Sequence, residues 1–213
     1  MFTYTNRRGV AYYVHEARTK TGVCRYVVKH TAEGALAELP VGMEIVENVN
    51  GQVSVRAARP VAVFPLEERL VQQALVKYGR EKYRVEVKGR DIVVHEPDFN
   101  ADDVTESMHP MNAWGILGPT LDKVMRKQLG DAAWEDYLRQ KKEQVRLGLE
   151  RTMRYSPVLR FCLNDASRRL FSVERMGYSG DGGWIWLKGA MPLAAACDHY
   201  VPLLGTDELF EEL

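Results

Sequence analysis

The longest run of apolar residues at helical spacing extends from Leu121 to Arg154. Residues three or four apart share one side of a helix, so this spacing predicts helices with a single buried side. A break at Gly130-Asp131 predicts two consecutive helices, because glycine is common just after a helix and aspartate just before one. The apolar stripe consists of Leu121, Val124, Met125, Leu129, Trp134, Tyr137, Leu138, Val145, Leu149 and Met153. We expect this helix pair to form the centre of the fold, with Trp134 and Leu138 buried.

Three β-hairpins are predicted before the helix pair, from short β-branched and aromatic runs separated by turn residues. Strands at residues 12–14 and 24–28 flank a turn at 19–22. Strands at residues 44–47 and 52–56 flank a second turn, whose asparagines and glycine tolerate the backbone of a tight reversal.

The third hairpin reverses at Gly89-Arg90, which places Lys88 opposite Asp91 and fixes the register of the two strands. Successive side chains of a strand point to opposite faces, so the register also sorts the residues by face. The face expected to meet the core carries Tyr83, Val85, Val87, Ile92 and Val94. The face expected to meet water carries Arg84, Glu86, Val93 and His95.

The remaining pattern predicts a helix at 66–77 and a helical turn within 31–40. Residues 97–119 have no periodicity, although Asp102-Asp103 and Glu106 could equally begin a short helix after Asn100. After the helix pair, the pattern predicts a three-stranded meander and two short helices at 192–199 and 207–213. The fold class is therefore α+β, with antiparallel β hairpins and a meander around a central helix pair. Three segments are expected: a small β module at 1–60, a helix, hairpin and long acidic loop at 61–118, and the helix pair, meander and closing helix at 119–213.

The 213 residues carry a formal net charge of zero and three cysteines without metal-ligand spacing. A chain of this size can bury a core without disulfides, so we expect free thiols, no cysteine metal site and a cytoplasmic location. We expect no membrane contact, since neither a signal peptide nor an apolar run of transmembrane length is present. Charge is nevertheless segregated, because residues 1–30 hold six bases and only one acid, Glu16.

The first hairpin and the residues before it interleave bases with aromatic side chains. This mixture is typical of surfaces that bind nucleic acid, where cations neutralise phosphates and aromatic rings stack on bases. Tyrosine is also a favoured strand residue, and exposed strands often carry lysine and arginine, so the same pattern fits a plain solvated hairpin. The candidate contacts are Arg7, Arg8, Tyr12, Arg18, Lys20, Arg25 and Lys29.

A second group of candidates follows the third hairpin. It contains oxygen and imidazole donors that suit a divalent cation, as a metal-dependent hydrolase would require. Its spacing matches no known metal motif, and acids on a loop are commonly just solvated. The candidate ligands are His95, Asp98, Asp102, Asp103 and His109.

Two further patterns have simpler interpretations. Cys197 and His199 are two residues apart on a predicted helix and point in different directions, so we expect a buried thiol and no catalytic pair. Residues 177–183 are rich in glycine but lack the lysine of a phosphate-binding loop, and we expect them to join two strands. Trp184 and Trp186 share one face of the strand that follows, as core or interface anchors.

Three groups of residues occur along the chain: Tyr12-Tyr13-x-His15 with Lys20-Thr-Gly22 and Arg25-Tyr26, Glu44-Ile-x-Glu47-Asn48 with Asn50-Gly-Gln-Val53, and Val158-x-Arg160-Phe161 with Gly183-Trp184. In these residues the chain resembles a family of uncharacterised bacterial proteins. The resemblance spans the two ends better than the middle, and it implies no activity and no functional residues.

These observations favour a non-catalytic binding or adaptor protein that uses the basic hairpin. Its expected partner is nucleic acid, or else an acidic protein surface. One alternative is the metal-dependent hydrolase built on the acidic loop. Another is a structural protein that forms a homo-oligomer through its apolar helix stripe. The sequence implies no particular cofactor.

Overall fold

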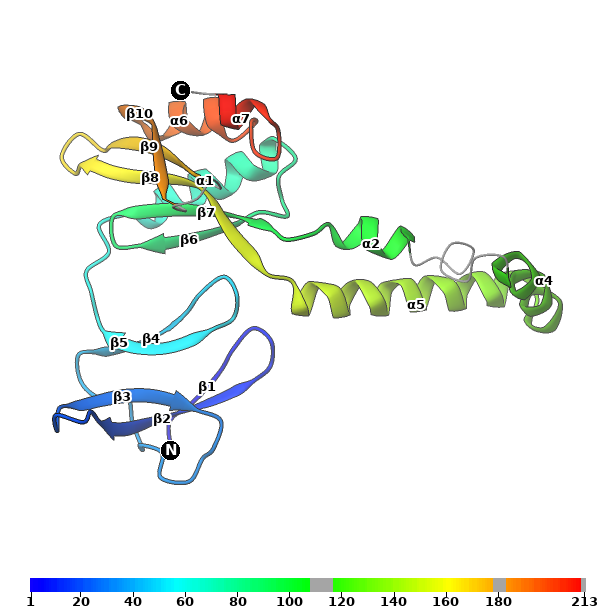
Figure 1. The fold of residues 1–213 in the computed structure, drawn as a ribbon, viewed down its shortest axis with the longest axis horizontal. Helices are drawn as coiled ribbons and strands as arrows, with labels where there is room; N and C mark the ends of the chain where they lie inside the picture. The colour runs from blue at the N-terminus through cyan, green and yellow to red at the C-terminus, as the bar shows by residue number, and fades with distance from the viewer. Residues whose placement is uncertain (108–116, 178–182, 212–213) are drawn as a thin grey trace. The chain divides into compact units, whose positions relative to one another are not determined.

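The computed structural model describes residues 1–107, 117–177 and 183–211, and it confirms the α+β class with antiparallel sheets (Figure 1). The chain divides into two compact units. One contains Met1–Glu96 and Tyr155–Leu213, and the other contains Pro97–Arg154. The first unit holds all the described strands except the end of β7, and the second is helical.

Residues 1–60, here called the N-terminal β module, form two small sheets. The three-stranded sheet has the order β1-β2-β3 and the second pairs β4 with β5, which confirms both predicted hairpins. The strands are β1 (Thr3–Thr5), β2 (Ala11–Arg18), β3 (Cys24–Lys29), β4 (Met43–Glu47) and β5 (Val53–Ala57). No helix forms within residues 31–40, so that prediction is wrong. This segment instead bonds to β2, since Leu36 N donates to the Val14 carbonyl at 2.8 Å.

Three reversals in this module share one pattern. In each, a polar residue is followed three positions later by a glycine with positive φ: Asn6 with Gly9, Thr19 with Gly22, and Asn48 with Gly51. The first side chain accepts a backbone N–H four residues ahead, from Val10, Val23 and Gln52 respectively. The repeated turn fixes where each hairpin reverses and therefore its register.

A five-stranded antiparallel sheet forms the rest of the first unit, in the order β10-β9-β8-β7-β6. Its strands are β6 (Arg84–Lys88), β7 (Asp91–Pro97), β8 (Tyr155–Asp165), β9 (Leu170–Met176) and β10 (Trp184–Pro192). The register predicted for β6 and β7 is confirmed. Strands expected in two different segments, 61–118 and 119–213, thus belong to one sheet.

The helices α1 (Pro65–Lys77), α6 (Leu193–Tyr200) and α7 (Glu208–Glu211) accompany this sheet and supply the other half of its core (Figure 1). Their apolar residues pack with those of alternate strand positions, including Ile92, Phe161 and Phe171. The predicted helix near 66–77 and the two short C-terminal helices are confirmed.

The second face of β6 and β7 is less exposed than expected. Val93 is 5% and His95 4% exposed, so the prediction that both lie in water is wrong. Glu86 lies between an imidazole and an ammonium group on this face, with its Oε2 3.1 Å from His95 Nε2 and 3.0 Å from Lys88 Nζ. Alternation in a sequence sorts residues by face, but only the tertiary structure decides whether that face is covered.

The second unit is inserted between β7 and β8, two neighbouring strands of the five-stranded sheet. It contains α2 (Ala101–Ser107), α4 (Gly118–Leu129) and α5 (Asp131–Thr152). The predicted helix pair is confirmed, and α2 is the short helix after Asn100 that the sequence left open as an alternative. Trp134 is buried as predicted, and its indole N–H donates to Asp122 at 2.8 Å. Leu138 is only half-buried.

The break between α4 and α5 differs in detail from its prediction. Gly130 has φ 83° and ψ 152°, a positive-φ conformation open essentially only to glycine, and it is not in the left-handed helical conformation. Gly130 is itself the residue that precedes α5, and Asp131 is the first helical residue. None of the helices in the described ranges combines the length and apolar character that crossing a membrane requires.

Candidate functional site

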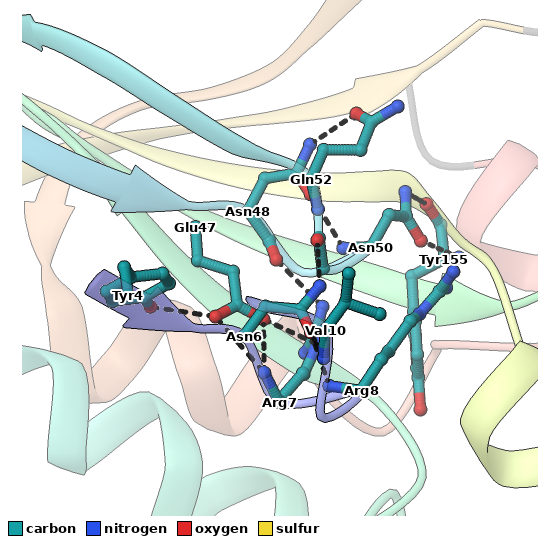
Figure 2. Close-up of polar contacts among 11 residues, drawn as sticks. Tyr4, Asn6, Arg7, Arg8, Val10, Glu47, Asn48, Asn50, Gln52 and Tyr155 are labelled. Carbon is teal, nitrogen blue, oxygen red and sulfur yellow. Dashed lines mark hydrogen bonds and ion pairs between the residues drawn. The ribbon is translucent and has the colours of Figure 1, made fainter. Parts of the chain in front are cut away.

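Asn6 organises the turn between β1 and β2 and joins it to the turn of the β4–β5 hairpin. Its side chain is buried, and Oδ1 accepts the backbone N–H groups of Arg8 at 3.0 Å and Val10 at 2.9 Å. Its Nδ2 donates to the carbonyl of Gly51 at 2.8 Å (Figure 2). One amide therefore shapes the turn that presents Arg7 and Arg8 and ties it to the turn at residues 48–51.

Glu47, at the end of β4, also contacts the turn between β1 and β2 (Figure 2). Its carboxylate accepts the Tyr4 hydroxyl at 2.8 Å and the backbone N–H of Arg7 at 3.1 Å, and it lies 3.4 Å from Arg7 Nε. The hydrogen bond to this carboxylate, followed by burial, raises the pKa of Tyr4, because both favour the protonated phenol. Arg7 Nη2 also donates to the carbonyl of Asn48 at 2.8 Å.

Arg8 lies against Gly51 at the other side of the junction. A Cβ atom on Gly51 would sit 3.1 Å from Arg8 Nε, and the glycine has φ 72°. Both facts favour glycine here, since a side chain would crowd Arg8 and strain the backbone. Arg7 and Arg8, predicted as nucleic-acid contacts, thus make specific contacts within the N-terminal β module.

Asn50 connects the N-terminal β module to the five-stranded sheet. Its Nδ2 donates to the carbonyl of Tyr155 at 3.0 Å, and its Oδ1 accepts the Tyr155 N–H at 2.7 Å (Figure 2). The side-chain amide thereby pairs with the first residue of β8 as a neighbouring strand would. Sequence reasoning missed this junction, although the repeated Asn-x-x-Gly turn at residues 6–9 and 48–51 was a readable signal.

The other candidate nucleic-acid residues lie along β2, β3 and their turn. Arg18 is opposite Cys24, and Tyr12 and Arg18 share one face of this hairpin. Arg25 and Lys29 face Ala17 and Tyr13, on the other face. Lys20 lies in the turn. The structure therefore gathers these residues on one hairpin but divides them between its two faces.

The cations of this hairpin differ from several arginines elsewhere in the described chain that have carboxylate partners. Arg18, Lys20, Arg25 and Lys29 are exposed, and none forms an ion pair within the described ranges. By contrast, carboxylates pair with Arg56, Arg126, Arg146, Arg160 and Arg169. The hairpin thus presents positive charge that the rest of the described chain does not neutralise.

Aromatic rings lie between these cations. Tyr12 contacts the ring of His30, with centroids 4.7 Å apart. Tyr26 is half-buried on the face that carries Arg18, and the neighbouring Cys24 raises its pKa, so it stays protonated near neutral pH. These rings are available for stacking only at their exposed edges and faces.

The five-stranded sheet carries a second polar cluster on the face away from its helices. Arg160 pairs with Glu174, lies 3.8 Å from Asp91, and stacks on Trp184 with its guanidinium carbon 4.3 Å from the ring centre. Beside this group, burial and then Asp91 raise the pKa of Cys162 to about 12. The thiol is therefore protonated and a weak nucleophile. Trp186 is 60% exposed, so the two tryptophans have different surroundings.

Within the described ranges, the structure does not place the candidate metal ligands close to one another. His95 is buried in β7, beside Glu86 in the first unit, whereas Asp98, Asp102 and Asp103 belong to the second unit. Among the residues described, no three of the types His, Cys, Asp and Glu are grouped so as to hold a metal ion. His109 lies outside the described residues.

The pair Cys197 and His199 behaves as predicted. Cys197 is buried in α6, where burial raises the pKa of its thiol to about 12, while His199 is exposed and contacts the ring of Tyr200. Cys24, Cys162 and Cys197 are all free thiols, which confirms the expected absence of disulfides.

Comparison with protein-family models, curated proteins and solved structures finds no match to this chain. The resemblance to uncharacterised bacterial proteins stays a prediction. The function must therefore be argued from the residues themselves.

Proposed function

We propose that this protein is a non-catalytic binding protein whose β2–β3 hairpin contacts nucleic acid. The observation that carries the proposal is the set of four exposed cations on this hairpin, Arg18, Lys20, Arg25 and Lys29, which form no ion pair within the described ranges. Phosphate backbones bind such cations by releasing condensed counterions, so unpaired bases contribute more than bases that must first leave a carboxylate.

The form of the hairpin supports the same proposal. β1 pairs with β2 only as far as Tyr13, so the outer part of β2 pairs with β3 alone in this sheet. A two-stranded ribbon fits the major groove of a duplex, where phosphates line both walls. Cations on both faces of the ribbon, with Lys20 at its end, suit that environment. Arg7 and Arg8 contribute indirectly, because their side chains make contacts that stabilise the N-terminal β module.

The test compares two variants that each lose four exposed positive charges, two arginines and two lysines. The hairpin variant replaces Arg18, Lys20, Arg25 and Lys29 with alanine. The control variant replaces Lys123, Lys127, Arg151 and Arg154, which are also exposed and form no ion pair in the described part of the chain. Binding of labelled single-stranded and duplex oligonucleotides of about twenty nucleotides is followed by fluorescence polarisation over a range of salt concentrations.

We expect the wild type and the control to bind with a steep salt dependence. In the hairpin variant, the slope of log affinity against log salt should decrease by about 3, since each lost phosphate contact removes about 0.7 to 0.9. No binding at low salt, or equal weakening in both variants, would contradict the proposal. Competition by polyglutamate as strong as that by DNA would favour an acidic protein surface as the partner.

A further inference from the structure

β6 is the outermost strand of the five-stranded sheet, so one of its edges has no strand beside it in the described part of the chain. The hairpin closes through the two-residue turn Gly89-Arg90, with Lys88 opposite Asp91. Hydrogen-bonded and non-hydrogen-bonded pairs alternate from that closing pair, so the N–H and C=O groups of Val85 and Val87 point to the outer edge. Such an edge is a template for another extended chain.

A pocket of about 250 Å³ adjoins this edge, between α1 and β6. Leu75 and Val76 line it from α1, and Tyr83 and Val85 line it from β6 and the residue before it. Val76 is 61% exposed although it is apolar, so the pocket offers apolar surface to solvent. Its remaining lining residues are Gln72, Glu81 and Arg84.

Charge differs between the two faces of β6. Val85 and Val87 pack towards the helices and the core, while Arg84, Glu86 and Lys88 share the opposite face. Glu86 is already paired with Lys88 and His95, and these hydrogen bonds outweigh the effect of burial, so its pKa is lowered and it stays ionised. Arg84 is exposed and forms no ion pair within the described ranges. The charge left over on this face is positive.

We propose that the edge of β6 binds an extended peptide in which apolar residues alternate with polar ones, acidic opposite Arg84 and Lys88 and uncharged opposite Glu86. The peptide adds a sixth strand to the sheet through main-chain hydrogen bonds to Val85 and Val87. An apolar side chain opposite Val85 enters the pocket beside Val76, and acidic side chains on the other face lie opposite Arg84 and Lys88. Main-chain pairing supplies affinity and the pocket supplies selectivity, as in other strand-addition complexes.

A second copy of this chain is a poorer occupant of the edge. Antiparallel pairing of two β6 strands about Glu86 would place Glu86 opposite its own copy and Arg84 opposite Lys88. Like charges directly opposite each other destabilise a strand pair. The bound segment is therefore expected to come from a different sequence.

The test uses a labelled glutamate–valine peptide of about eight residues that contains Glu-Val-Thr-Val-Glu, so that the threonine lies opposite Glu86, and a lysine–valine peptide with both glutamates replaced by lysine as its charge control. Val76→Glu places a carboxylate at the pocket. Leu66→Glu is the matched control, since Leu66 is also an exposed apolar residue of α1, at 73%, and does not line the pocket. Because both side chains are exposed, neither variant should unfold the protein. Amide exchange of Val85 and Val87, followed by NMR, reports strand pairing directly.

We expect the glutamate–valine peptide to bind the wild type and Leu66→Glu equally, and Val76→Glu about tenfold more weakly. The lysine–valine peptide should bind about tenfold more weakly than its acidic counterpart, and the bound peptide should slow exchange of both valine amides. The proposal is overturned if the acidic peptide does not bind, if Val76→Glu binds it as well as Leu66→Glu does, or if exchange at Val85 and Val87 is unchanged. Occupation of the edge by a second copy, seen as a dimer in which exchange at Val85 and Val87 is already slow without peptide, would also overturn it.

Discussion

The N-terminal β module and the five-stranded sheet belong to one unit, but different kinds of interaction stabilise each of them. The main cluster of buried apolar residues in the described ranges lies entirely between Val63 and Leu209. In the module, the buried residues include the polar Asn6 and His15 as well as the apolar Val14 and Val49. The Asn6 amide donates to Gly51 and the Glu47 carboxylate accepts from Arg7, and these bonds connect two of its turns. Asn48 accepts a hydrogen bond within the second of these turns, and Asn50 accepts one from Tyr155 of β8.

This difference shows how a small β module can be ordered without a large core. Apolar burial stabilises in proportion to area and depends little on direction, whereas a buried amide stabilises one particular geometry. The module therefore presents its hairpin in a defined orientation while leaving most of that hairpin exposed. We therefore expect a substitution in the core of the five-stranded sheet to destabilise the whole unit. A substitution among the hydrogen-bonded turn residues should destabilise only the N-terminal β module.

The largest effect is expected from Phe161→Ala. Phe161 is fully buried in the main core, so the change should destabilise the protein by about 3–5 kcal/mol through lost burial and the cavity left behind. Chemical denaturation followed by tryptophan fluorescence measures it. Exposed Phe64, changed to alanine, is the control and should have a much smaller effect. Similar losses for both would mean that Phe161 does not belong to the main core.

Asn6→Ala should have a smaller and local effect. It removes three hydrogen bonds at the junction, and we expect a cost of about 1–3 kcal/mol confined to the N-terminal β module. Hydrogen exchange with mass spectrometry should show faster exchange in residues 1–60 and unchanged protection around Phe161. Asn164→Ala, at an exposed position, is the control. Faster exchange throughout the five-stranded sheet would show that the two regions are not stabilised separately.

Glu86 tests whether charge also stabilises the sheet. Burial alone would raise the pKa of Glu86, but hydrogen bonds to His95 and Lys88 lower it below the ordinary value of 4.5. A lowered folded-state pKa means that the ionised group stabilises the fold above that ordinary value, and that this contribution is lost as pH falls through the folded-state pKa. Glu86→Gln should therefore reduce the loss of stability between neutral and acidic pH, measured by denaturation at a series of pH values.

The matched control for this measurement is Glu38→Gln. Glu38 is exposed and forms no ion pair in the described part of the chain, so its variant should follow the wild-type pH profile. An unchanged profile in Glu86→Gln would rule out a stabilising role for the pair with His95.

The smallest effect is expected for the three cysteines. Their rates of modification by a thiol reagent show how accessible each region is, without a change in its stability. Cys24 is exposed in the module, whereas the raised pKa values of Cys162 and Cys197, each about 12, make these thiols unreactive in the folded sheet. A thiol reagent at pH near 8 should modify one cysteine quickly, and Cys24→Ser should abolish that fast reaction. Rapid modification of a second cysteine would indicate opening of the sheet.

Much of the local structure followed from the sequence because its causes are local. The Gly89-Arg90 turn and the alternation around it were enough to fix the pairing of β6 with β7. Helix spacing with a glycine break was enough to locate α4 and α5. Of the candidate site, the basic hairpin at β2 and β3 was predicted, but its division into two faces and the internal contacts of Arg7 and Arg8 were not.

The sequence by itself thus determined the turns, the strand registers and the positions of most helices, since residues a few positions apart decide these. The tertiary structure alone decided that β7 and β8 are neighbours across the insertion Pro97–Arg154, and that Val93 and His95 are buried. It also decided that the Asn50 amide pairs with Tyr155. These features join residues far apart in the chain, and their stability comes from contacts that exist only once the separate elements have packed together.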